Sequence, residues 1–124
     1  MARVVTLCLL ACLALRPLPV AARAAGAALE IDHLINAVAT SPCRFERNQR
    51  WYDGPQAATH LRDKLQWIAA TTQVETAEEF IAKVASTSSF SSRSYVVRCS
   101  AGTEISAGLW LRKELARLRA RTEP

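Results

Sequence analysis

Histidine and serine are the residue types in this sequence that could do chemistry, and their spacing limits what that chemistry could be. The two histidines, His33 and His60, form no H-x-x-x-H or H-E-x-x-H motif. Serines are dense from Ser86 to Ser94, but no G-x-S-x-G elbow or S-x-x-K motif accompanies them. Because metal sites and hydrolases need converging ligands or an activated nucleophile, we predict no metal site and no cofactor.

A hydrolase-type site stays open as an alternative, because His60 could reach the Ser86–Ser94 loop once the chain is folded. A base beside a serine hydroxyl is the minimum that such a reaction requires. Polar loops whose side chains form hydrogen bonds with their own backbone are far commoner than catalytic serines that lie outside a known motif. Whether the protein is an enzyme is therefore uncertain, and the non-enzymatic interpretation is favoured.

The N-terminus has the layout of a secretory signal peptide over residues 1–24. It starts with Arg3, continues as an apolar run over residues 4–15, and ends in small residues that allow cleavage after Ala22 or Ala24. The apolar run is too short to span a bilayer, so no transmembrane segment is expected after signal removal. We predict a single small periplasmic or secreted domain over residues 25–124, with lipoprotein processing at Cys12 as a minor alternative.

Export and signal cleavage determine which cysteines remain and whether they are oxidised. Cys8 and Cys12 fall in the leader, which leaves Cys43 and Cys99 in a compartment that oxidises thiols. We therefore predict a disulfide between Cys43 and Cys99, which would stabilise the domain by about 4 kcal/mol. The bond consumes both thiols, and no C-x-x-C pair is present, so thiol catalysis is not expected.

The charge balance excludes a strongly basic domain. The whole chain has a formal net charge of +5, and three of its arginines lie in the leader, so the remainder carries only +2. Binding of nucleic acid is therefore not predicted. Arg44, Arg47 and Arg50 are close in sequence, and they leave an anion- or envelope-surface binder as a further alternative.

Helical and strand patterns alternate along the chain and predict an α+β fold. Apolar spacing of 3–4 residues predicts about four helices, at residues 28–40, 55–70, 77–85 and from about 106. Thr76 and Glu79 form a capping box for the third of these helices. Cys43–Arg47 and Tyr95–Cys99 alternate as short strands. Pairing them in a disulfide-stapled, two-stranded antiparallel ribbon would set Phe45 opposite Val97.

An ordered set of short motifs resembles one family over residues 30–110. The motifs are Arg47-Asn48, Tyr52, Ala57-x-x-His60-Leu61-x-x-Lys64, Thr76-Ala77-Glu78-x-Phe80-Ile81, Ala85-Ser86-x-Ser88-Ser89 and Tyr95-x-Val97. They are similar to those of the YfeK-like family of small exported bacterial proteins, catalogued as domain of unknown function 5329. The family has glycine where this chain has Gln49 and Ser92, which implies tight turns there. The resemblance implies an exported domain and carries no known activity.

The polar residues within these motifs form a candidate cluster if the ribbon packs on the second and third helices. They are Arg47, Asn48, Tyr52, His60, Lys64, Glu78, Ser88, Ser89 and Tyr95. The cluster could brace the ribbon by hydrogen bonds alone, or it could bind a partner. We predict a non-enzymatic protein- or ligand-binding module, whose partner is an unknown envelope protein or small ligand.

Overall fold

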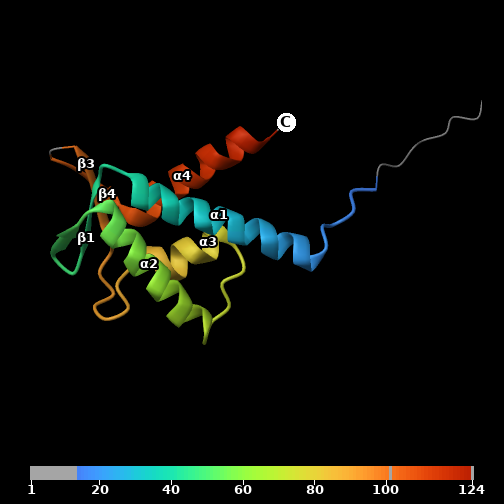
Figure 1. Ribbon diagram of the computed structural model, residues 1–124, viewed down its shortest axis with the longest axis horizontal. Coiled ribbons are helices and arrows are strands. Elements are labelled where there is room, and N and C mark those ends of the chain that lie inside the picture. Colours follow the sequence, from blue (N-terminus) through green and yellow to red (C-terminus); the bar gives the residue numbers. More distant parts are fainter. Residues whose placement is uncertain (1–13, 101, 124) are drawn as a thin grey trace, which may run out of the picture.

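A long N-terminal helix, α1 (Val20–Thr40), spans the molecule in the computed structural model, which describes residues 14–100 and 102–123 (Figure 1). Its buried stripe is the one the sequence predicts: Ile31, Leu34, Ile35 and Val38. The helix starts well before residue 28, because the preceding alanine-rich segment favours helix without needing burial. The expected signal peptide's residues 1–13, with Cys12, lie outside the described residues.

The second helix, α2 (Gly54–Ala69), agrees with the predicted helix at residues 55–70 to within one residue at each end. The Asp53 side chain accepts a hydrogen bond from the Gln56 amide, and the Gln56 side chain accepts one from the Asp53 amide. This reciprocal capping box satisfies amides that have no partner within the helix. Gly54 lies against the end of α1, where a Cβ would come within 2.4 Å of the Val38 carbonyl oxygen.

The third helix lies at the centre of the core. Its first turn, α3 (Ala77–Phe80), is capped by the Thr76 side chain as predicted, and the π-helical segment η1 (Ile81–Ala85) continues it. The other half of the predicted capping box is wrong, because the Glu79 side chain accepts from the Glu75 amide and not from that of Thr76. Phe80, Ile81 and Val84 have no measurable exposure. The segment packs against α2 and against α4 (Ala107–Thr122), so the helices gather around it.

The sheet confirms the predicted pairing and extends it. β1 (Arg44–Arg47) and β3 (Val96–Ser100) pair antiparallel with Phe45 opposite Val97. The expected two-stranded ribbon is nevertheless too small, because β2 (Arg50–Tyr52) and β4 (Thr103–Ser106) extend it to four strands in the order β2-β1-β3-β4. These outer strands are too short to show an alternating pattern in the sequence, and each forms because a hairpin places it beside a partner.

Two tight turns use left-handed backbone without glycine. Asn48 and Gln49 have φ of 50° and 68° in the β1–β2 hairpin, and Ser92 has φ of 59° in the loop before β3. Two successive positive φ values match the turn that suits a two-residue hairpin. The tight turns implied at Gln49 and Ser92 are therefore present, with side chains that the left-handed region disfavours.

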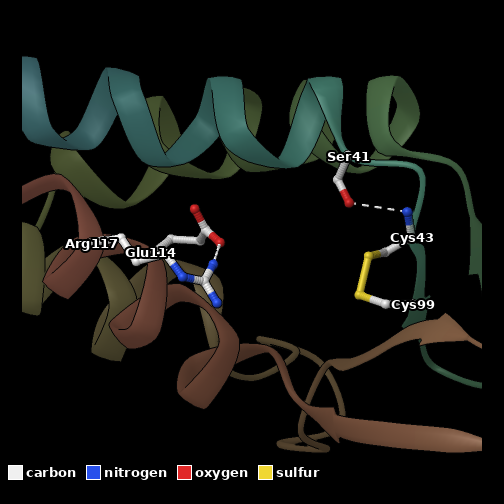
Figure 2. The surroundings of a disulfide bond; sticks show 5 residues. All are labelled: Ser41, Cys43, Cys99, Glu114 and Arg117. Carbon is white, nitrogen blue, oxygen red and sulfur yellow. Dashed lines mark hydrogen bonds and ion pairs between the residues drawn. A yellow bond between two sulfur atoms is a disulfide. The ribbon is translucent and has the colours of Figure 1, made fainter.

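The Cys43–Cys99 disulfide is present and joins the turn between α1 and β1 to β3 (Figure 2). The Cys43 amide also donates a hydrogen bond to Ser41 Oγ at 3.0 Å, which fixes the turn between α1 and β1. Cys43 is buried in the core, whereas the Cys99 side of the bridge is exposed. The α+β class, with a mainly helical body and a stapled sheet, is confirmed.

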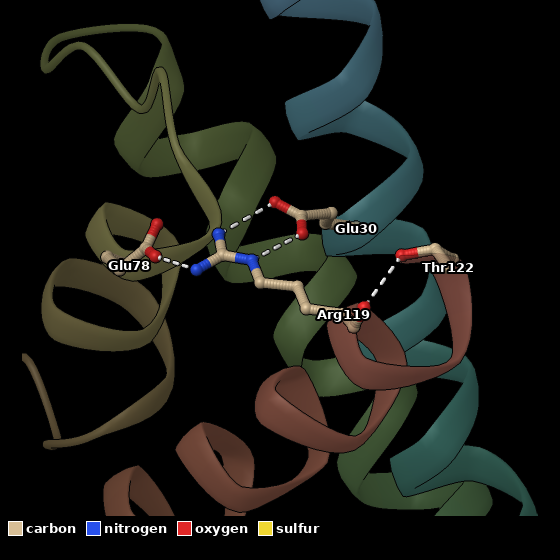
Figure 3. Close-up of polar contacts among 4 residues, drawn as sticks. All are labelled: Glu30, Glu78, Arg119 and Thr122. Carbon is tan, nitrogen blue, oxygen red and sulfur yellow. Dashed lines mark hydrogen bonds and ion pairs between the residues drawn. The ribbon is translucent and has the colours of Figure 1, made fainter. Parts of the chain in front are cut away.

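An arginine on α4 ties three helices together at the end opposite the sheet. Arg119 donates to both carboxylate oxygens of Glu30 on α1, at 2.8 and 3.0 Å, and also to Glu78 on α3 (Figure 3). The hydrogen bonds to Glu30 and to Glu78 raise the pKa of Arg119. The hydrogen bond from Arg119 is also the main cause that lowers the pKa of the Glu78 carboxyl.

None of the helices in the described part of the chain combines the length and apolar character of a membrane span.

Candidate functional site

Three residues form the centre of the polar cluster: His60 and Lys64 on α2, and Tyr95 just before β3. Lys64 Nζ donates to the Tyr95 hydroxyl at 3.0 Å, and His60 Nε2 lies 3.2 Å from the same oxygen. The spacing of four residues places both side chains on one face of α2. The helix and the strand therefore meet through a shared tyrosine hydroxyl.

Lys64 is a buried cation. Its side chain is only 7% exposed, and its ammonium group also donates to the Thr87 carbonyl oxygen. Burial, together with the charge of Arg47, lowers the pKa of Lys64 from 10.5 to about 8. The amine thus remains mostly protonated at neutral pH, at a cost that its two hydrogen bonds partly offset.

His60 is the neutral member of the cluster. Burial is the largest cause that lowers its pKa from 6.5 to about 4, and the charges of Arg47 and Lys64 act in the same direction. Since an ammonium can only donate, the Tyr95 oxygen accepts from Lys64. Burial also raises the pKa of Tyr95, so the phenol stays protonated.

Arg47 extends the positive charge from β1. One guanidinium nitrogen lies 3.4 Å from the Tyr52 hydroxyl, and the group stacks 5.3 Å from the centre of that ring. The hydrogen bond from Arg47 lowers the pKa of Tyr52. Arg47 lies on the same strand face as Phe45, since side chains alternate along a strand. It therefore projects toward the helices, as Phe45 does.

A second set of contacts joins the β1–β2 hairpin to the serine loop. The Asn48 side-chain amide donates to Ser88 Oγ at 3.1 Å, and the Ser91 hydroxyl donates to Asn48 Oδ1. Ser88 is 4% exposed, and its oxygen is also close to the Phe90 and Ser91 amides. Ser88 thus holds the loop in place, and it bonds to Asn48 rather than to His60.

Two of the predicted residues lie apart from these contacts. Glu78 is at the start of α3, where it pairs with Arg119 on the far side of the core from the sheet. Ser89 is exposed and lies beside the cluster without a side-chain hydrogen bond among the described residues. The structure therefore brings together Arg47, Asn48, Tyr52, His60, Lys64, Ser88 and Tyr95, and it separates Glu78 from them.

A pocket of about 320 Å³, here called the inner pocket, opens between α2, the sheet and the start of α4. Its apolar wall includes Phe45, Leu61, Trp110 and Leu111, and its polar groups include Arg47, Tyr52, His60 and Tyr95. Phe45 and Trp110 pack edge to face with ring centres 5.7 Å apart. An apolar hollow with a few convergent polar groups is the usual form of a small-molecule site.

A second hollow of about 310 Å³, the outer pocket, lies beside it and shares Arg47, His60 and Tyr95. Its other residues include Lys64 and two exposed aromatic side chains, Trp67 and Phe90. The spacing of His60, Lys64 and Trp67 along one flank of a helix is visible in the sequence. The contributions of Trp110 to the inner pocket and of Phe90 to the outer pocket are not visible in the sequence. Both residues come from segments that only folding brings alongside α2.

Within residues 14–100 and 102–123, no three His, Cys, Asp or Glu side chains converge as metal ligands. Comparison with protein families gives one finding: the model of a family of unknown function, DUF5329, matches residues 25–119. No curated protein matches the chain. No solved structure matches it.

Proposed function

The chain belongs to DUF5329, a family of unknown function, and we propose that this member is a non-enzymatic binding module. Its ligand is a small molecule with an apolar body that enters the inner pocket. The observation that carries this proposal is the pocket itself, about 320 Å³ in volume, which is lined by apolar side chains such as Phe45 and Trp110 and by the polar groups of Arg47, His60 and Tyr95.

The cost of keeping this hollow supports a binding role. Apolar side chains that line an open hollow stay in contact with water, so a domain of this size would gain stability by closing it. It would also gain by replacing a buried lysine with an apolar side chain, because desolvating the ammonium is costly. Features that lower stability in this way are common at functional sites.

We further propose that the protein acts outside the cytoplasm, as a small exported bacterial domain of the YfeK-like type. The layout of residues 1–24 as a signal peptide supports this location. The disulfide between Cys43 and Cys99 supports it too, because such bonds persist in oxidising compartments. Processing after residue 24 leaves the pocket residues, which begin at Val38, in the mature chain.

The contacts of the serine loop favour binding over hydrolysis. Ser88 Oγ accepts from Asn48, and His60 Nε2 is engaged by Tyr95. A serine nucleophile needs a base within hydrogen-bonding reach, and this pair does not supply one. A flat anionic surface is likewise a weaker fit than a pocket ligand, because Arg47 lies in a pocket wall while Arg44 and Arg50 are exposed at the sheet.

The test uses a neutral fluorescent probe, N-phenylnaphthylamine, whose emission rises in apolar surroundings. We expect saturable binding at one site per chain. Ala57→Leu places a larger side chain in the inner pocket and should abolish the binding. Ala116→Leu makes the same change at an exposed position on α4 and should leave it intact. Absence of saturable binding, or equal binding by both variants, would refute the proposal.

A further inference from the structure

We infer that the ligand of the inner pocket is an amphiphilic anion, with a carboxylate-like group held by Arg47 beside His60 and Tyr95. This inference rests on the proposed function and names the chemical class of the ligand. The head group would sit where the inner and outer pockets share their wall, and the apolar body would extend along Phe45 and Trp110.

The first argument is the balance of charge around the two pockets. Ion pairs between the described residues involve Lys83, Arg98, Arg117 and Arg119. Arg47 and Lys64 are in none of them, although Arg47 is half-buried and Lys64 is almost fully buried. An almost fully buried ammonium is normally paired with an acid, so these two cations leave the site without a balancing negative charge.

The acidic groups nearby do not supply that charge. Asp63 borders the outer pocket, but its side chain is exposed on α2. Glu46 borders the inner pocket, and its carboxylate already accepts from the Gln49 amide in the hairpin turn at 2.9 Å. Neither forms an ion pair with Arg47 or Lys64 among residues 14–100 and 102–123.

The second argument is the hydrogen-bonding capacity left at the shared wall. A guanidinium has five N–H donors, and the side-chain contact of Arg47 within the described residues is the 3.4 Å one to Tyr52. A planar fork of free donors matches the two oxygens of a carboxylate. His60 adds a neutral ring, whose pKa an anion would raise again by offsetting the nearby positive charges.

The third argument is the mixed lining of the inner pocket. Arg47 supplies positive charge, whereas Phe45, Leu61, Trp110 and Leu111 are apolar. A cationic ligand would be repelled by Arg47 and Lys64, and a neutral one would leave the guanidinium desolvated without a partner. An apolar body with one anionic end matches both kinds of lining.

The experiment compares three probes that share an eight-carbon chain and differ in the charge of the head: octanoate, octanol and octyltrimethylammonium. Isothermal titration calorimetry below their aggregation concentrations gives each affinity. We expect octanoate to bind at least about tenfold more tightly than octanol, as a charge-assisted hydrogen bond implies. The ammonium probe should bind most weakly.

Variants at the sheet locate the head group. Arg47→Gln should remove the preference for octanoate over octanol while leaving octanol binding unchanged, and Arg47→Lys should restore part of it. Arg44→Gln removes the same charge from the other face of β1 and should have no effect. Melting curves of each variant establish that it is folded. If Arg47→Gln does not fold, Arg47→Lys, which keeps the charge but loses the planar fork of donors, should still bind octanoate more weakly than the unchanged protein does.

The outcomes separate this inference from the proposed function. Equal affinity for octanoate and octanol, unchanged by Arg47→Gln, would overturn the anionic head while the binding role stands. So would binding of N-phenylnaphthylamine without any binding of octanoate. Octanoate binding that survives Ala57→Leu would place the anion elsewhere and overturn the inference. Failure of N-phenylnaphthylamine to bind would overturn the proposed function and, with it, this inference.

Discussion

Removal of the disulfide offers the sharpest test of how the fold is held together. Cys99→Ser is the suitable change, because this side of the bridge is exposed, and a serine there buries no unpaired hydroxyl. The same substitution at Cys43, which is 6% exposed, would add a burial penalty to the loss of the bond. The variant at Cys99 therefore isolates the effect of the cross-link.

The magnitude follows from the separation of 56 residues between the two cysteines. Without the bond, the unfolded chain regains freedom worth about 4 kcal/mol. A domain of this size has a free energy of unfolding of roughly 5–15 kcal/mol, so the loss is a large share of the total. At about 4–8 °C per kcal/mol, the midpoint of thermal unfolding should fall by roughly 15–30 °C.

The assay is urea unfolding followed by circular dichroism, on the oxidised protein, the reduced protein and Cys99→Ser. The reduced protein and the variant should unfold at the same urea concentration, well below the oxidised form. Reductant should not alter the variant further. If the free energy of unfolding of Cys99→Ser lies within about 0.5 kcal/mol of that of the oxidised protein, the Cys43–Cys99 cross-link is not what stabilises the sheet, and the reasoning fails.

Three further predictions follow from the β1–β2 turn, the contact of Gly54 with α1 and the half-buried His60. Gln49→Gly should raise the free energy of unfolding by up to about 1 kcal/mol, because glycine adopts φ of 68° without strain, and a fall in the urea midpoint would contradict this. Gly54→Ala should destabilise by about 1–3 kcal/mol, because its Cβ would meet the Val38 carbonyl oxygen, whereas Gly26→Ala, with open space around it, should not. The folded pKa of His60 is about 4 against 6.5, so the unfolded chain takes up this proton first as pH falls and stability should drop between pH 6.5 and 4 by up to about 3 kcal/mol. His60→Gln should flatten that part of the profile, and an unchanged slope would show that other groups cause it.

Several elements could be predicted because their determinants are local or covalent. The Thr76 cap and the stripe from Ile31 to Val38 depend on residues within two helical turns. The β1–β3 register depends on the cross-link, which sets Phe45 opposite Val97. The α+β class follows from these features together. β2 and β4 could not be read in this way, because their pairing exists only once a neighbouring strand is in place.

The candidate site, too, could be predicted only in part from the sequence. The short motifs that resemble the family pointed to Arg47, His60, Lys64 and Tyr95 as polar residues of interest, because motif residues can be recognised in the sequence without a structure. They could not place Glu78 correctly, since a position within a motif does not say at which end of the core a helix begins. Only the tertiary structure decided that the Lys64 ammonium is buried and that Trp110 completes an apolar pocket beside Arg47. Burial and cavities depend on what packs around a residue, and those neighbours are distant in the sequence.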